Sequence, residues 1–454
     1  WTIFIGLCIV IRVLFLGISW TSYFAIIFSL HQFFLLYTSI GYIIPVRYLF
    51  GTFMCLQFFI GPTLAYNGLD QYQYKLYKMQ IGEAEYFAYA IPAVISFILG
   101  LHIRAGNLNG ETINQKGIRD FVKINPKLPY IFIILGFFSS ILSEFFSSEL
   151  AFVFYVLGSF KFIGLFLLIM SDSQLKLAPL VLVVGSIIVS SLGNGMFHDL
   201  LTWLIFLGAV YAIKYQPGNN IKLIASAGFV FLSVVIQQLK GDYRSATNVQ
   251  GQTGGIETFT KTYEAKSEKN SLFSFESLAP SNVRINQGFI ITNIMKTVPD
   301  RVPYSNGVEM RQVLEAAILP RFLAPNKLNA GDREIFIKYS GIKLRSGTSM
   351  ALSSLGDAYL NFGIFGGAVF MFCLGLFYSL VLNLFHKRSI KQPVLTLFSC
   401  ILFYYPIRPD CELQTILGHL VKSAFIILAM VYFWKNIFRD QSKMTAEPQP
   451  LALN

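Results

Sequence analysis

The stretch AYLNFGIFGGAVFMFCLGLFYSLVLNLF, residues 358–385, contains no Asp, Glu, Lys or Arg. A helix needs ~20 predominantly apolar residues to cross ~30 Å of hydrocarbon, and this run exceeds that length. Lipid cannot satisfy the open edge of a sheet, and the run is continuous rather than alternating, so a helix is the expected structure. The stretch therefore predicts a membrane-spanning helix.

The rest of the chain has the same character. Of its 454 residues, 54% are hydrophobic, 16% are aromatic and only 13% are charged, which is typical of a chain with a bilayer as its main solvent. About twelve runs approach the length of a span: residues 1–17, 20–45, 49–65, 84–103, 129–144, 149–170, 177–195, 198–213, 221–239, 358–385, 392–407 and 413–434. We expect an all-α polytopic membrane protein.

The positions of Lys and Arg in the short loops indicate its orientation. One face collects most of them: Arg47, Arg104, Lys116, Arg119, Lys123, Lys127, Lys176, Lys214, Lys222, Lys387, Arg388, Lys391, Lys435, Arg439 and Lys443. The opposite face has Lys75, Lys78 and Arg408. This asymmetry predicts cytoplasmic termini and an extracytoplasmic segment between the ninth and tenth helices. Since the chain begins with Trp1, we also expect residues before it, and no cleavable signal peptide is recognisable.

Four regions follow from this topology. Residues 1–239 form an N-terminal bundle of about nine helices, and residues 240–355 form an extracytoplasmic helical cap. Residues 356–436 supply about three more helices, and residues 437–454 are a cytoplasmic tail.

The net charge of +12 does not indicate nucleic acid as a partner, because topology explains most of it. The five cysteines have no paired spacing, and we interpret them as packing residues. No Walker motif and no His/Cys/carboxylate set with metal-ligand spacing occurs, so an ATP-driven pump and a metal enzyme are not expected.

The segment 240–355 begins with a polar stretch, 241–270, that is typical of a surface loop. Helices are then expected from apolar residues at helical spacing. The first has Asn282 as its expected N-cap and Phe289 and Ile294 on one face, and the second runs through GVEMRQVLEAAILP to Pro320, because proline has no N–H to donate.

Positive charge is in excess in this segment, with 15 Lys or Arg against 10 Asp or Glu between 240 and 355. Long external loops are exempt from the orientation rule, so topology does not explain the excess. Arginine gives bidentate contacts to phosphate, and a lipid diphosphate would lie at this depth. The alternative is that these cations pair with lipid headgroups or neighbouring acids.

A second cationic centre is YPIRPDCELQTILGHLVKS, residues 405–423. Arg408, Asp410 and Glu412 occupy a short outer loop, and a spacing of three places His419 and Lys422 on one face of the last helix. Ionisable residues inside a span are functional candidates, although Lys422 paired with an acid such as Asp410 would also explain its presence. Weaker candidates are Glu144, His198 and Asp199 on the outer side.

Five segments together carry a family resemblance: QQLKGDYR (237–244), VRINQGFIITNIMKTVP (283–299), YSNGVEMRQVLEAAILPRFLAPNK (304–327), GTSMALSSLGDAYLNFGIFGG (347–367) and IRPDCELQTILGHLVKS (407–423). Their order and the single large outer loop resemble the bacterial O-antigen and exopolysaccharide polymerases, the Wzy-like proteins. The resemblance covers chiefly residues 237–425, and the first nine spans match only in hydropathy. We therefore expect a GT-C-like bundle in a bacterial cytoplasmic (inner) membrane.

The resemblance implies a membrane glycosyltransferase that needs neither metal nor cofactor. It would transfer a growing glycan from undecaprenyl diphosphate to the terminal sugar of a new lipid-linked repeat unit. The resemblance also implies partners in the same pathway, a chain-length regulator and a flippase.

The diphosphate would be held by outer arginines and supporting lysines, which are Lys240, Arg244, Arg284, Arg321, Lys327, Arg408 and Lys422. Fixed cations would stabilise the departing phosphate. Asp410, Glu412 and His419 are the alternatives for the base that activates the attacking hydroxyl.

Other functions stay open. A ligase that passes finished glycan to another acceptor would use the same donor. A flippase or transporter of the lipid-linked unit would favour charges through the whole membrane depth, and a non-enzymatic scaffold would tolerate the loss of Arg321 and Arg408.

Overall fold

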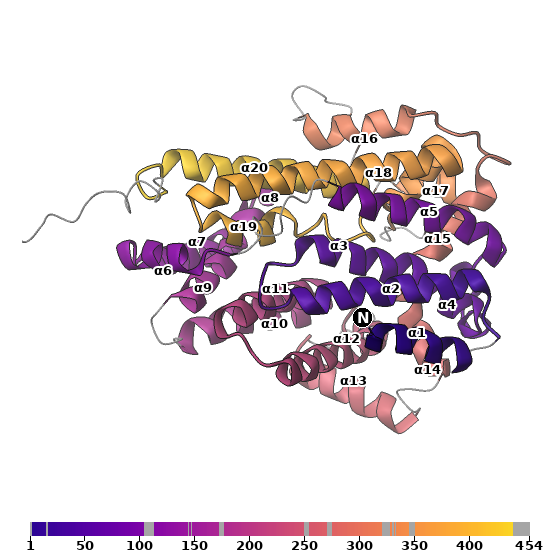
Figure 1. Ribbon diagram of the computed structural model, residues 1–454, viewed down its shortest axis with the longest axis horizontal. Helices are drawn as coiled ribbons and strands as arrows, with labels where there is room; N and C mark the ends of the chain where they lie inside the picture. Colours follow the sequence, from indigo (N-terminus) through magenta and orange to yellow (C-terminus); the bar gives the residue numbers. More distant parts are fainter. Residues whose placement is uncertain are drawn as a thin grey trace, which may run out of the picture.

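The structure is a computed structural model that describes residues 2–14, 17–103, 113–143, 145–146, 148–171, 177–248, 254–269, 275–319, 327–328, 331, 333–344 and 350–438. Helices make up its regular structure, as the composition predicts (Figure 1). Expected features at Arg104, Glu144, Lys176, Pro320 and Arg321, and most of the tail 437–454, lie outside the described residues.

Seven helical segments in the described residues are long and apolar enough to cross a membrane. They are Val46–Tyr66, Glu83–His102, Ala151–Met170, Leu177–Asn194, Asn219–Thr247, Ser353–Lys391 and Leu413–Phe433. One further pair, α6 (Gln115–Ile124) and α7 (Leu128–Leu142), passes the same test together but bends by 86° at its break. The chain is thus a helical membrane protein.

The most extensive helix packing joins α5 (Glu83–His102) and α18 (Ser353–Lys391), which run side by side (Figure 1). Glycines permit this close approach, as expected of helices in lipid. A Cβ at Gly375 would overlap the carbonyl oxygen of Phe97, and one at Gly100 would overlap that of Phe372. Near its start, α18 bends at Gly363, whose φ of 68° is open to glycine but strained for other residues.

Arg47 ties this pair to α3 (Val46–Cys55), which continues through a π-helical turn (Leu56–Ile60) into α4 (Gly61–Tyr66). Topology predicted Arg47 in a loop, but its side chain is only 1% exposed. It donates hydrogen bonds to the carbonyl of Leu101, to Ser379 at 2.9 Å and to Asn383 at 2.8 Å. These acceptors satisfy a charge that lipid would not.

Most of the remaining helices fall into two groups along the chain. The first group is α1 (Thr2–Leu14), α2 (Trp20–Ser39), α8 (Ser148–Gly158), α9 (Phe160–Met170), α10 (Leu177–Asn194), α11 (His198–Tyr215) and α12 (Asn219–Asn248). The second group follows α12: α13 (Ile256–Lys269), α14 (Phe275–Ile285), α15 (Gly288–Thr297), α16 (Val308–Ile318) and α17 (Arg333–Ser340).

Helices were expected in this second group only after residue 270. The surface loop expected over 241–270 is wrong, because α12 continues to Asn248 and α13 occupies Ile256–Lys269. Two boundaries of the later helices were also predicted. The helix predicted before Pro320 is confirmed, because α16 ends at Ile318. The expected N-cap Asn282 is wrong, since it lies inside α14 and the cap of the next helix is Gln287. The break at Asn286 and Gln287 allows close contact with α4, where a Cβ on Gly61 would come within 2.6 Å of the Asn286 Cα.

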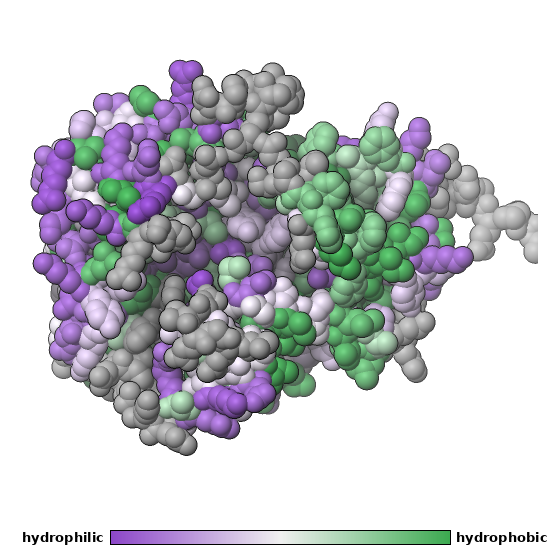
Figure 2. Space-filling model, turned by 180° about the vertical axis from the view of Figure 1, so that it is seen from behind, coloured by the Kyte–Doolittle hydropathy of each residue, from purple (hydrophilic) through white to green (hydrophobic). Residues whose placement is uncertain are grey.

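Hydrophilic and hydrophobic side chains separate on the surface. Seen from behind, hydrophilic residues cover the end of the molecule that carries α14, α15 and α17, and a hydrophobic patch lies beside them (Figure 2). The amphipathic helix α6 lies at the opposite end (Figure 1), with Ile118, Phe121 and Val122 buried. This separation fits a protein that crosses a bilayer along its long axis.

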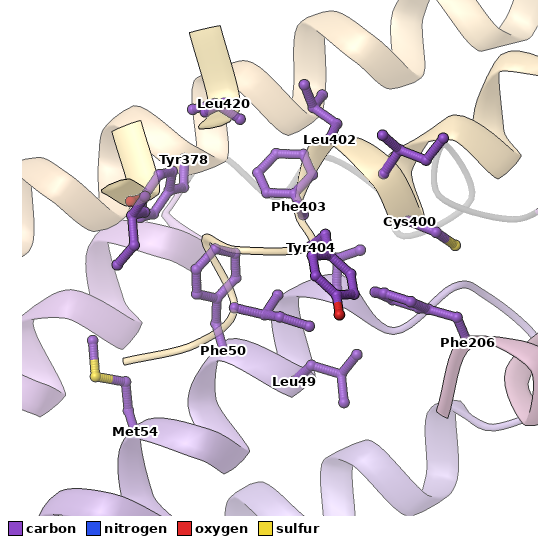
Figure 3. Close-up of a cluster of buried hydrophobic side chains, with 14 of the residues drawn as sticks. Leu49, Phe50, Met54, Phe206, Tyr378, Cys400, Leu402, Phe403, Tyr404 and Leu420 are labelled. Atoms are coloured by element: carbon purple, nitrogen blue, oxygen red, sulfur yellow. The ribbon is translucent and has the colours of Figure 1, made fainter. Parts of the chain in front are cut away.

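The last two helices are joined by a buried, irregular segment. A continuous span was expected over 392–407, but α19 (Leu395–Leu402) has only 8 residues before the chain turns. Residues 403–412, here called the broken segment, lead to α20 (Leu413–Phe433). Figure 3 shows Phe403 and Tyr404 beyond the end of α19, facing Leu49 and Phe50 of α3. Irregular backbone within a membrane bundle is stable only where protein or water satisfies it.

Candidate functional site

Arg408 is the central cation of the broken segment. Its side chain is 13% exposed, and its Nη2 atom lies 3.7 Å from Asp410 Oδ2. The guanidinium carbon stands 5.2 Å from the centroid of the Tyr405 ring, a cation–π contact. Its buried Nη1 atom has no hydrogen-bond partner among the described residues. A buried charged donor without an acceptor costs more than the roughly 1–3 kcal/mol of a neutral one, so this atom is suited to an anionic ligand.

Asp199 joins the broken segment to the start of α11. Tyr404 donates its phenolic hydrogen to Asp199 Oδ1 at 2.5 Å, and His198 Nε2 lies 2.7 Å from the same oxygen. Arg408 also interacts electrostatically with Asp199. A carboxylate, an imidazole and a guanidinium are therefore close together at this site.

Aromatic rings surround these charges. Tyr404 stacks on Trp203 with ring centroids 5.2 Å apart, and Tyr405 packs edge-on against Tyr155 at 6.2 Å. Rings of this size hold the backbone turns in place and limit access by water, which strengthens electrostatic interactions in the site.

His419, a predicted base, is 2% exposed. Its Nε2 atom lies 2.8 Å from the carbonyl oxygen of Ile401, and its ring centroid is 4.9 Å from that of Tyr405. These contacts fasten α20 to the end of α19. The geometry is that of a positioning residue for the broken segment.

The two predicted carboxylates differ in their surroundings. Asp410 is 36% exposed and pairs with Arg408. Glu412 accepts a hydrogen bond from the backbone of Gly331 at 2.7 Å, which brings the segment before α17 to the start of α20. Beside them, burial and the charge of Asp410 raise the pKa of Cys411 to about 12, so this thiol stays protonated near neutral pH.

Arg244 is a second predicted arginine, and the structure places it beside the turn that precedes α11. It lies near the end of α12, and a Cβ on Gly195 would come within 2.9 Å of its Cγ. Gly195 has a φ of +59° and turns the chain three residues before His198. Lys240 lies one helical turn earlier on α12.

The other predicted cations have different surroundings. Lys327 donates to the carbonyl oxygens of Leu319 at 2.8 Å and Ala316 at 3.3 Å, so it caps the end of α16. The ammonium of Lys422 lies 4.5 Å from the centroid of the Phe152 ring, and the residue is exposed. Arg284 belongs to α14, and Arg321 lies outside the described residues.

Sequence reasoning ranked His198 and Asp199 low and missed Tyr155 and Tyr404. Their signal was weak, because tyrosine is common at the ends of membrane helices and a His-Asp pair at a helix start resembles ordinary capping. Only the return of the broken segment to α11 brings these side chains to Arg408.

No protein-family model matches this chain, and neither does any curated protein or solved structure. The chemistry of the site therefore has to be inferred from its own residues.

Proposed function

We propose that this protein is a polymerase of lipid-linked oligosaccharide repeat units. The reaction transfers a growing glycan from undecaprenyl diphosphate to the terminal sugar of a new lipid-linked unit, without metal or other cofactor. The observation that carries the proposal is Arg408: a buried cation on a broken membrane segment, with one nitrogen atom that no described residue accepts from. The order of motifs that resemble the Wzy-like proteins gives additional support.

The topology belongs to the same proposal. About twelve helices form a GT-C-like bundle in a bacterial inner membrane, and the termini are cytoplasmic. Residues 240–355 form the extracytoplasmic cap, so α14–α17 lie outside and α6 lies at the cytoplasmic surface. The basic residues of α6 agree with this direction.

The proposed reaction forms one glycosidic bond and breaks another bond to the same anomeric carbon. A hydroxyl oxygen of the acceptor sugar forms a bond to the anomeric carbon of the donor, whose bond to the diphosphate oxygen breaks. The lipid diphosphate leaves with the bonding electron pair and gains negative charge. A fixed guanidinium stabilises that charge better in the transition state than in the ground state, and removal of one such donor typically costs about 10²–10³ in rate.

Arg408 is the principal phosphate contact in this proposal, and Arg244 is the second because it borders the Gly195 turn, which precedes His198. Lys240, Arg284, Arg321 and Lys422 are further contacts implied by the resemblance. Lys327 has its ammonium on the end of α16, so its contribution is to hold the end of that helix.

The test uses the purified full-length protein and a synthetic lipid-linked repeat unit, with products sized on a gel. We expect a ladder of polymer from the wild-type protein. Alanine at Arg321, Arg408 or His419 should leave single units on the carrier. Arg311→Gln is the matched control, because that side chain is 82% exposed and pairs only locally with Glu315 among the described residues. Normal long chains from all three alanine variants would refute the site.

The same assay separates the competing functions. Transfer of preformed glycan to a different acceptor without chain growth would identify a ligase. Movement of labelled lipid-linked unit between leaflets of a vesicle, with no new glycosidic bond, would identify a flippase.

A further inference from the structure

The pair His198 and Asp199 forms an acid–base unit beside Arg408. Asp199 Oδ1 is shared by His198 Nε2 at 2.7 Å and the Tyr404 hydroxyl at 2.5 Å. Because a carboxylate only accepts hydrogen bonds, the His198 proton lies on Nε2. The other ring nitrogen, Nδ1, then carries a lone pair that can accept a proton.

Exposure distinguishes His198 from His419, the other candidate histidine. Its side chain is 31% exposed, so a ligand can reach it, whereas His419 is 2% exposed. Asp410 is paired with Arg408 and would compete with phosphate for the same cation. Tyr404 is buried and donates a hydrogen bond to Asp199. This bond fixes the carboxylate next to the imidazole.

We infer that His198 is the proton acceptor of the transfer reaction and that Asp199 and Tyr404 are its positioning residues. This inference rests on the proposed polymerase function. The acceptor hydroxyl gives its proton to His198 Nδ1 as its oxygen bonds to the anomeric carbon, and the diphosphate leaves toward Arg408. Asp199 stabilises the imidazolium that forms, and the proton then passes to solvent.

In this arrangement the base and the principal phosphate contact come from different elements. The base comes from the start of α11, and the phosphate contact comes from the broken segment. The Tyr404–Asp199 hydrogen bond sets the distance between them. The other groups that interact electrostatically with Asp199 are Tyr155, Tyr404, Tyr405, Arg408 and Cys411.

The experiment compares the purified wild-type protein with His198→Gln, Asp199→Asn and the control His386→Gln, which lies near the far end of α18. Chain elongation is measured from pH 5 to 9, and affinity for undecaprenyl diphosphate is measured separately. General-base catalysis contributes about 10²–10⁴-fold to a rate. We therefore expect His198→Gln to lose elongation rate by a factor in this range while its affinity for undecaprenyl diphosphate stays unchanged. The control should keep the wild-type rate.

Two readouts distinguish proton transfer from a purely structural role. Free imidazole in the buffer should partly restore elongation in a His198→Ala variant. Asp199→Asn removes the carboxylate that orients the ring, so it should lower the elongation rate while the affinity for undecaprenyl diphosphate stays unchanged. A wild-type rate and pH profile in His198→Gln would overturn the inference. A loss of rate in His198→Ala that imidazole does not restore would overturn it as well.

The outcome also separates this inference from the function on which it rests. If the wild-type protein makes no polymer, the proposed function fails. If it makes polymer and the histidine variants behave as wild type, only the assignment of the base fails.

Discussion

The hydroxyl of Tyr404 lies 2.5 Å from Asp199 Oδ1 and joins residues that are 205 positions apart in the sequence. It is the link between α11 and the broken segment, which otherwise meet through apolar packing around Trp203. Both the phosphate contact and the base of the proposed reaction depend on this link, because Arg408 follows Tyr404 by four residues and His198 precedes Asp199.

Tyr404→Phe tests this link. The variant keeps the ring that stacks on Trp203 and removes only the hydrogen bond to a charged acceptor, which is worth about 1.5–3 kcal/mol. We expect a lower midpoint of thermal unfolding in detergent and slower elongation. Tyr215→Phe is the matched control, because Tyr215 is 46% exposed at the end of α11. Equal behaviour of the two variants would show that the hydrogen bond does not hold the site together.

The approach of α5 and α18 gives a second prediction. Gly375→Ala places a methyl group against the Phe97 carbonyl, and overpacking of this kind typically costs about 1–3 kcal/mol. Gly208→Ala is the control, since nothing lies within 4 Å of the Cβ it would add. That change should be neutral or stabilising by up to about 1 kcal/mol, because alanine favours helix over glycine. Unfolding in a denaturant series measures both, and equal stability would contradict the close packing.

Arg47 gives a third prediction. Arg47→Met preserves much of the side-chain length but removes the hydrogen bonds to Leu101, Ser379 and Asn383. Each acceptor loses a charged donor in a buried setting, so we expect a loss of stability of at least about 2 kcal/mol. Arg311→Met, on an exposed helix face, should change stability by less than about 1 kcal/mol. A thermal shift of the same size in both variants would argue against a structural role for Arg47.

Hydropathy predicted the membrane class and long helices such as α18, because burial in lipid is a property of consecutive residues. It failed at α19, where an apolar run predicted a full span. Pro406 and Pro409 lie in the broken segment and indicate the break in the sequence, because each proline disfavours helix at the residue before it. Side-chain partners were harder still. Charge counting assigned Arg47 to a loop, and nothing in the sequence predicts that Lys327 donates hydrogen bonds to the end of α16.

Of the candidate site, Arg408 and its neighbouring acids could be recognised from sequence because charge is rare in such a chain. The role of His198 could not, because its relation to Arg408 depends on a contact between α11 and a segment about 200 residues later. Long-range contacts of this kind leave no pattern in a single sequence.

His419 allows the two roles of histidine to be separated. Its Nε2 contact with Ile401 and its place between Tyr405 and Phe152 predict that it positions the broken segment rather than accepting a proton. His419→Gln should therefore lower the unfolding temperature and reduce the affinity for undecaprenyl diphosphate, because Arg408 loses its support. The pH profile of the remaining elongation should stay that of the wild type, and imidazole should not rescue it. Rescue by imidazole, or a flattened pH profile, would instead make His419 the base and return His198 to a capping role at the start of α11.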